Sequence, residues 1–171
     1  MKDTRDNIKQ LTKTAMMAAL VFLGTFVFKI PTPNGYTHLG DCLIFVAVLA
    51  LGWKRGAIAG GLGAALADLA GGYAVWIIPT FFIKSIMAII MGLITEKVLK
   101  KYGYGWIPGA IAGGIFQILA YTIVKFPLYG KAVAITEFIP LTIQTVTGVV
   151  LSIVIVAVLD KSRVLNKLKE A

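Results

Sequence analysis

Long apolar runs alternate with short polar stretches along the whole chain, and this pattern predicts six membrane-spanning helices. The runs cover residues 14–28, 39–51, 57–70, 80–94, 108–124 and 138–159. Several of them are shorter than the roughly 20 residues that a helix needs to cross a bilayer. We therefore expect the runs 39–51 and 57–70 to merge with flanking residues, or to be tilted and irregular inside the bundle.

The stretches between the runs contain residues that interrupt helices. Residues 1–13 are polar and are expected to form a short cytoplasmic lead, as an interfacial helix that continues into the first span. Two prolines, an asparagine and a glycine predict a loop at 29–35, and Pro127 with Gly130 predicts another at 125–131. A tight basic turn is predicted at 52–56, and an uncharged aromatic connection at 71–79.

Composition supports the membrane interpretation. The 171 residues are 58% hydrophobic and only 15% charged, with a mean hydropathy of +0.84, whereas soluble domains carry about 25% charged residues. The predicted fold class is an all-α integral membrane bundle of six transmembrane helices, and residues 1–171 are expected to form a single domain. The one cysteine, Cys42, excludes an intrachain disulfide.

The distribution of basic residues predicts the orientation. With six spans, all of the 17 Lys and Arg residues fall on one side except Lys29, Lys84, Lys125 and Lys131. Because cytoplasmic loops collect Lys and Arg, both termini are predicted to be cytoplasmic. The formal net charge of +9 has this cause, so we do not expect a nucleic-acid partner.

Polar and aromatic residues cluster at the opposite, non-cytoplasmic ends of the spans. Such a mixture is typical of a small-molecule site, and Asn34, Thr80 and Lys125 belong to the same region. The candidate substrate-binding residues are Tyr36, His38, Asp41, Asp68, Tyr73, Trp76, Lys84, Gln117, Tyr121, Glu137 and Gln144.

Each candidate also has a structural interpretation. The tyrosines and Trp76 can form an aromatic belt at the membrane surface. Asp68 and Lys84, in consecutive spans, can form a buried structural pair, and Gln117 and Gln144 can join helices by hydrogen bonds. With one histidine and no nucleotide-binding loop or nucleophile motif, the sequence predicts no metal site, no cofactor and no enzyme activity.

Ala15 and Ala19 lie one helical turn apart at the start of the first span. They form a flat strip, which either packs within the bundle or binds the helices of a partner protein.

These features together resemble the substrate-binding S components of energy-coupling factor (ECF) vitamin transporters. The resemblance covers nearly the whole chain. It rests on Ala15-x-x-x-Ala19, on Thr37-His38-Leu39-Gly40-Asp41, on Ala67-Asp68 followed by Gly71-Gly72-Tyr73, and on Pro79-Thr80 followed by Lys84. The matching subfamily includes riboflavin, hydroxymethylpyrimidine and pyridoxine types.

The resemblance implies a multi-pass protein of a prokaryotic cell membrane that binds a vitamin from outside. It would deliver the vitamin in complex with a transmembrane T component, which contacts Ala15 and Ala19, and with two cytoplasmic ATPases that bind ATP. Because positive charge is not clustered near the candidate site, we favour hydroxymethylpyrimidine or pyridoxine, with riboflavin next. The alternatives are a stand-alone transporter or channel, an intramembrane enzyme using Asp68 or His38, and a structural subunit without a ligand.

Overall fold

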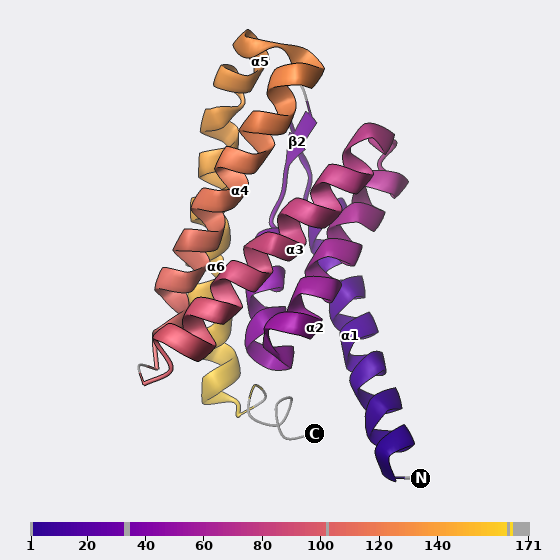
Figure 1. The fold of residues 1–171 in the computed structure, drawn as a ribbon, viewed down its shortest axis with the longest axis vertical. Coiled ribbons are helices and arrows are strands. Elements are labelled where there is room, and N and C mark those ends of the chain that lie inside the picture. The colour runs from indigo at the N-terminus through magenta and orange to yellow at the C-terminus, as the bar shows by residue number, and fades with distance from the viewer. Residues whose placement is uncertain (1, 33–34, 102, 164, 166–171) are drawn as a thin grey trace.

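The computed structural model describes residues 2–32, 35–101, 103–163 and 165 and is mainly helical. Its long helices lie side by side as an elongated bundle (Figure 1), which confirms the all-α membrane class. In chain order, the elements are α1 (Lys2–Phe26), β1 (Ile30–Thr32), β2 (Gly35–Thr37), α2 (Gly40–Ala70), the 3-10 helix η1 (Ala74–Trp76), α3 (Ile77–Leu93), the π-helical turn η2 (Ile94–Val98), α4 (Trp106–Tyr129), α5 (Lys131–Thr136) and α6 (Phe138–Lys161).

Helix α2 folds back on itself at Gly52, whose φ of 79° and ψ of 167° are not helical. A Cβ atom on Gly56 would lie 2.6 Å from the Cα atom of Val48, and one on Gly60 would lie 2.8 Å from Cγ2 of Ile44. The two arms therefore pack against each other at glycine positions. The expected runs 39–51 and 57–70 are these arms, and the turn between them is tighter than the predicted 52–56.

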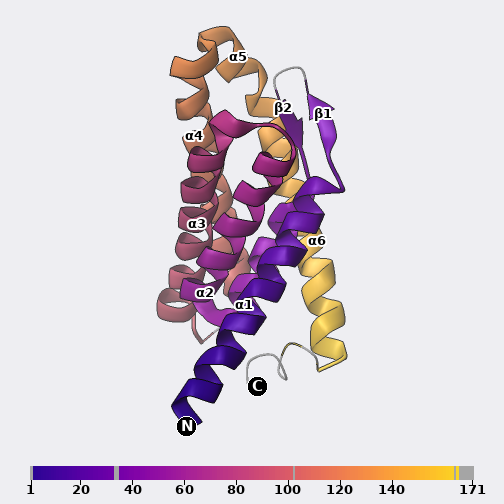
Figure 2. The same cartoon turned by 90° about the vertical axis from the view of Figure 1, so that its right-hand side faces the viewer.

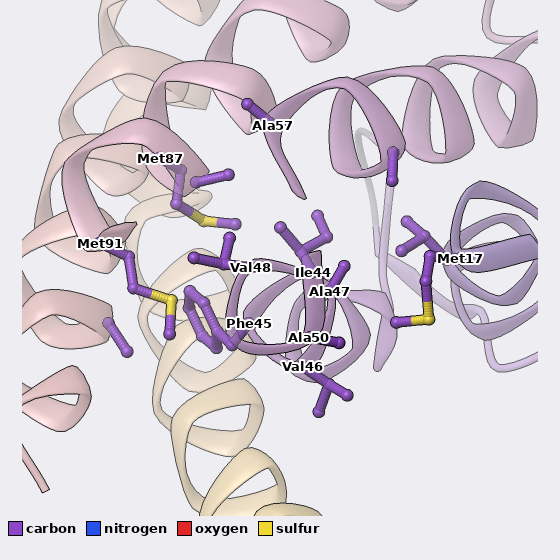
Figure 3. Close-up of a cluster of buried hydrophobic side chains, with 14 of the residues drawn as sticks. Met17, Ile44, Phe45, Val46, Ala47, Val48, Ala50, Ala57, Met87 and Met91 are labelled. Atoms are coloured by element: carbon purple, nitrogen blue, oxygen red, sulfur yellow. The ribbon is translucent and has the colours of Figure 1, made fainter. Parts of the chain in front are cut away.

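The first arm of α2 forms the centre of the bundle (Figure 3). Its apolar side chains are buried on all sides, as expected for a helix without a polar face. Phe45 and Val48 lie toward Met91 and Met87 of α3, while Ile44 and Ala47 lie toward Met17 of α1.

The two ends of the bundle differ in character. The start of α1, the turn of α2, the α3–α4 connection and the end of α6 lie at one end (Figures 1 and 2). The β1–β2 hairpin, α5 and the α2–α3 connection lie at the other end. The predicted basic segments therefore share one end, and the candidate site lies at the opposite end.

Four helical stretches among the described residues are long and apolar enough to cross a membrane. They are Gly40–Ala70, Ala74–Val98, Trp106–Tyr129 and Lys131–Lys161. The first contains both arms of α2, and α1 is not among the four. The expected count of six spans, with both termini cytoplasmic, stays a prediction.

Two predicted loops need correction. In the first, residues 30–32 and 35–37 form the paired antiparallel strands β1 and β2, with Ile30 opposite Thr37. The predicted loop at 125–131 is largely helical, because α4 continues through Pro127 to Tyr129. Proline removes one N–H donor but keeps a helical φ, and the helix ends only at Gly130, whose φ is 84°.

The polar lead was predicted correctly as a helix that runs into the first apolar run. Helix α1 begins at Lys2 and is continuous to Phe26, two residues short of the expected end.

Candidate functional site

A cavity of about 50 Å³ lies at the end of the bundle that carries the β1–β2 hairpin. Its lining comes from the hairpin and from α2, η1, α3, α4 and α6, so distant parts of the chain meet there. The lining residues are Tyr36, His38, Asp68, Tyr73, Trp76, Thr80, Tyr121, Lys125, Leu141 and Gln144.

Aromatic rings form two parts of the cavity wall. The rings of Tyr36 and Tyr73 have centroids 4.8 Å apart, and those of Trp76 and Tyr121 are 5.6 Å apart. The Trp76 ring is fixed by its Nε1–H, which donates to the Tyr129 hydroxyl at 3.1 Å. These rings offer flat surfaces on which a planar heteroaromatic ligand can stack.

His38 follows β2 and is held as a neutral ring. The backbone N–H of Gly40 donates to its Nδ1 at 3.1 Å, so the ring proton is on Nε2. Burial lowers the pKa of His38 to about 3, assisted by the positive charges of Lys84 and Lys29 and opposed by Asp41. At neutral pH, the ring is therefore neutral, and its Nε2 lies 3.5 Å from Gln144 Nε2 beside the cavity.

Asp68 lies in the last turn of α2 and is 4% exposed. The Tyr36 hydroxyl donates to its Oδ1 at 2.5 Å, so the hairpin and α2 are joined at the cavity. Burial raises the pKa of the Tyr36 hydroxyl above its usual range, and the Asp68 charge adds to this effect. Tyr36 is therefore a permanent donor at physiological pH.

A buried polar network lies beside the cavity and joins four helices. Lys84 of α3 pairs with Asp41 of α2 at 2.5 Å and also donates to Gln117 Oε1 at 2.6 Å. Gln117 of α4 donates to Asp41 Oδ2 at 2.8 Å, and Gln144 of α6 donates to the same oxygen at 3.0 Å. Asp41, Lys84 and Gln117 are 0% exposed, so these three side chains are isolated from solvent, while Gln144 also lines the cavity.

The pairing of Lys84 differs from the sequence interpretation, in which Asp68 was its candidate partner. Lys84 lies two turns into α3, whereas Asp68 lies near the end of α2 and bonds Tyr36. Asp41 reaches Lys84 because the first arm of α2 begins inside the bundle. There, a Cβ atom on Gly148 of α6 would lie only 2.9 Å from that of Asp41.

A second ion pair lies at the edge of the cavity. Lys125 Nζ lies 3.1 Å from Glu137 Oε2, and the Thr32 hydroxyl donates to the same oxygen at 3.3 Å. Gln144 Oε1 accepts hydrogen bonds from the Thr37 hydroxyl at 3.0 Å and from the His38 backbone N–H at 3.3 Å. The β1–β2 hairpin is thus attached to α6 through Gln144 and to the α5–α6 junction through Glu137.

The structure brings most of the predicted site residues together. Seven line the cavity, namely Tyr36, His38, Asp68, Tyr73, Trp76, Tyr121 and Gln144. Asp41, Lys84 and Gln117 belong to the buried network, and Glu137 pairs with the lining residue Lys125. Asn34 lies outside the described residues. Two residues were missed: Leu141, which lines the cavity, and Thr145, whose hydroxyl accepts a hydrogen bond from Gln117. An apolar residue and a threonine within a hydrophobic run have no sequence feature that marks them as part of a site.

The predicted docking strip lies on a different part of the molecule. Ala15 and Ala19 are exposed on α1, whereas Thr14, Met17 and Val21 on the same helix are buried. The strip therefore does not pack inside the described bundle, and its face of α1 is open to a lipid or protein neighbour.

A helical membrane bundle with an aromatic and polar cavity at one end has the form of a solute-binding membrane protein. The chain belongs to the family of ECF-type riboflavin transporter S components, whose family model matches residues 5–161. The family assignment agrees with the resemblance seen in the sequence, and it places the protein among non-enzymatic transport subunits of prokaryotic membranes.

Individual relatives extend the comparison. The chain is 28% identical over 168 residues to the thiamine precursor transporter HmpT of Lactococcus lactis subsp. cremoris (strain MG1363), covering 96% of each chain. It is also 35% identical over 133 residues to an uncharacterised protein of Pyrococcus woesei, covering 77% of this chain and 88% of that protein.

A solved structure of the S component of a bacterial ECF transporter matches the fold. The TM-score is 0.70, and the match covers 95% of this chain and 99% of the other. At 24% sequence identity, this likeness supports the fold and not the ligand.

Proposed function

We propose that the protein is the substrate-binding subunit of an ECF importer and takes a single-ring vitamin precursor from outside the cell. Hydroxymethylpyrimidine or pyridoxine is the favoured ligand, and riboflavin is the next candidate. The observation that carries the proposal is the small cavity in which aromatic rings stand beside fixed hydrogen-bonding groups.

The size of the cavity supports a single ring. One water molecule needs about 10–15 Å³ by the same measure, so a cavity of about 50 Å³ has room for about four waters. One substituted ring fits this space better than the three fused rings and sugar-alcohol chain of riboflavin.

The charge around the cavity supports a neutral or weakly basic ligand. The region around the cavity contains three carboxyl groups, those of Asp41, Asp68 and Glu137. It contains the same number of lysines, namely Lys29, Lys84 and Lys125. Two of these lysines are already in ion pairs, and Lys29 lies 4.7 Å from the centroid of the Tyr36 ring. A phosphorylated ligand would find no unpaired cluster of positive charge among the described residues.

The relative named as a thiamine precursor transporter supports the same choice. Hydroxymethylpyrimidine is a precursor of thiamine, whereas the description of the matching family names riboflavin. The small volume of the cavity supports the single-ring ligand of these two candidates.

Delivery would follow the pattern of the family. In our proposal, all six apolar runs cross the membrane, both termini are cytoplasmic and the cavity opens toward the outside. The exposed strip at Ala15 and Ala19 would bind the transmembrane T component, and two ATPases attached to that component would supply the energy. The cytoplasmic end would then be the one where the basic segments gather.

The test is native mass spectrometry of the detergent-purified protein with a panel of vitamins, followed by calorimetry on any compound that binds. We expect one pyrimidine or pyridine compound to bind at nanomolar strength. If no vitamin binds to the folded protein, the proposal is wrong and a structural role is favoured. Uptake by this chain alone, in liposomes that lack ATPases, would favour a stand-alone transporter.

A further inference from the structure

One oxygen atom of Asp68 has no partner in the described part of the protein. Oδ1 accepts the hydrogen bond from Tyr36, but Oδ2 is buried and makes no hydrogen bond. The Thr80 hydroxyl lies near this carboxyl group; it accepts a hydrogen bond from Tyr121 at 3.1 Å and keeps its own proton for a second bond. Asp68 is 4% exposed and lines the cavity, so a molecule within the cavity can donate to Oδ2.

Leaving such an atom unpaired is costly. Buried polar atoms in proteins almost always have a hydrogen-bond partner, and an exception needs an explanation. The other buried carboxyl groups of the region satisfy this rule: Asp41 bonds Lys84, Gln117 and Gln144, and Glu137 bonds Lys125 and Thr32. The Asp68 carboxyl group differs because its remaining capacity faces the cavity.

The geometry of a carboxyl group limits what can fill this position. Each oxygen has two lone pairs, so Oδ1 can accept a second bond beside that from Tyr36. An ionised carboxylate accepts two adjacent N–H donors, whereas a protonated one donates through one oxygen and accepts through the other. An amino group next to a ring nitrogen is complementary to both forms, because the shared proton can sit on either the ring or the carboxyl group.

We propose that Asp68 selects the ligand by pairing with an amino group and the ring nitrogen beside it. The site would then take an amino-substituted pyrimidine in preference to rings that carry only hydroxyl or oxo groups. This inference rests on the proposed function and narrows its ligand class. Asp68 is the specificity-determining residue.

Other lining groups fit the rest of such a ring. The His38 ring and the Gln144 amide, whose Nε2 atoms lie 3.5 Å apart, both line the cavity and offer polar atoms for a ring nitrogen or hydroxyl oxygen away from the Asp68 edge. The rings of Tyr73 and Trp76 cover its faces. The cavity therefore supplies a carboxyl edge for the amino side of the ring and donors for its acceptors.

Calorimetry with matched ligands tests the inference. The probes are hydroxymethylpyrimidine, which carries the amino group, the same pyrimidine with hydrogen in place of that group, pyridoxine and riboflavin. For the wild-type protein, we expect removal of the amino group to weaken binding by roughly 10- to 100-fold, since a buried charged partner loses its donor. In Asp68→Ala, the ratio between the first two probes should fall to about one.

Two further variants make the result specific. Asp160→Ala removes an exposed carboxylate on α6 and should keep the wild-type ratio. Tyr36→Phe keeps the Asp68 side chain but removes the hydroxyl that orients it, and should lower the ratio even if Asp68→Ala does not fold. Equal binding of the first two probes to wild type, or an unchanged ratio in both Asp68→Ala and Tyr36→Phe, would overturn the inference.

The two proposals can fail separately. Tight binding of pyridoxine or riboflavin with weak binding of the aminopyrimidine overturns the role of Asp68 but leaves the protein a vitamin-binding subunit. If none of the four probes binds to the folded protein, both proposals are wrong.

Discussion

Replacing Lys84 by methionine removes one charge of the ion pair that joins α2 and α3. Methionine has a similar length and no charge, so the apolar part of the side chain is retained. Asp41 would keep its hydrogen bonds from Gln117 and Gln144 but would lose its only counter-ion among the described residues. Because Asp41 and Lys84 are both 0% exposed, no solvent can replace the lost partner.

The expected cost is large because the remaining charge is buried. Removal of one partner of a buried ion pair destabilises proteins by about 3–5 kcal/mol. For a chain of this size, about 1 kcal/mol changes the melting temperature by about 2–4 °C. Lys84→Met should therefore lower the melting temperature in detergent by about 6–20 °C.

A double variant separates the unpaired charge from lost packing. Asp41→Asn keeps an oxygen that accepts from the two glutamines but carries no charge. The pair Asp41→Asn with Lys84→Met should therefore melt higher than Lys84→Met alone, since no uncompensated charge remains. Lys131→Met, which removes an exposed lysine near the same end, is the matched control and should change the melting temperature little.

These differences are measured by thermal unfolding of the wild-type protein, Lys84→Met, the double variant and Lys131→Met, followed by intrinsic tryptophan fluorescence. The argument from buried charge is refuted if the double variant is less stable than Lys84→Met. It is also refuted if Lys84→Met melts within about 2 °C of the Lys131→Met control.

Three further predictions concern other parts of the molecule. The double variant Ala15→Trp and Ala19→Trp should not assemble with the T component, as measured by co-purification. Calorimetry should show unchanged ligand binding in the same variant. A normal yield of the complex would show that the docking surface lies elsewhere. The pKa of His38 is about 3 in the folded protein against 6.5 for an unperturbed ring, so between these pH values the unfolded state binds one more proton. The stability should therefore fall as the pH is lowered from 6.5 to 3, by up to about 1.4 kcal/mol per pH unit. His38→Gln should reduce that slope in pH-dependent melting, and an equal slope would exclude this residue as its source. Gly56→Ala should cost about 1–3 kcal/mol, because its Cβ atom would meet the Val48 backbone, and a melting temperature equal to that of wild type would contradict the close packing of the two α2 arms.

The apolar runs predicted the helices, and the asymmetry of basic residues indicated the end of the bundle at which the cavity lies. These signals are strong because bilayer thickness and the excess of cytoplasmic Lys and Arg act on whole segments. They also explain why Trp76 and Tyr121, which are 45 residues apart in sequence, could be assigned to one site. The sequence therefore predicted which segments are helical and at which end of the bundle the polar and aromatic residues gather.

The pairing of individual side chains was beyond the reach of the sequence. Sequence distance favoured Asp68 as the partner of Lys84, but depth in the bundle decides which groups meet. The tight turn at Gly52 and the close approach of Gly148 to Asp41 set that depth. Neither effect has a sequence signal of its own, because glycine in a membrane helix is equally consistent with simple close packing.

Gln144 connects the two parts of the site more directly than any other described residue does. Its amide nitrogen donates to Asp41 in the buried network, while its amide oxygen accepts from Thr37 and from the His38 backbone in and after β2. A single side chain therefore positions the hairpin relative to the ion pair that joins α2 and α3. Because a primary amide satisfies both sets of partners only in one orientation, the network fixes where Tyr36 and His38 stand in the cavity. The buried ion pair of Asp41 and Lys84 is thus connected to the cavity wall through Gln144.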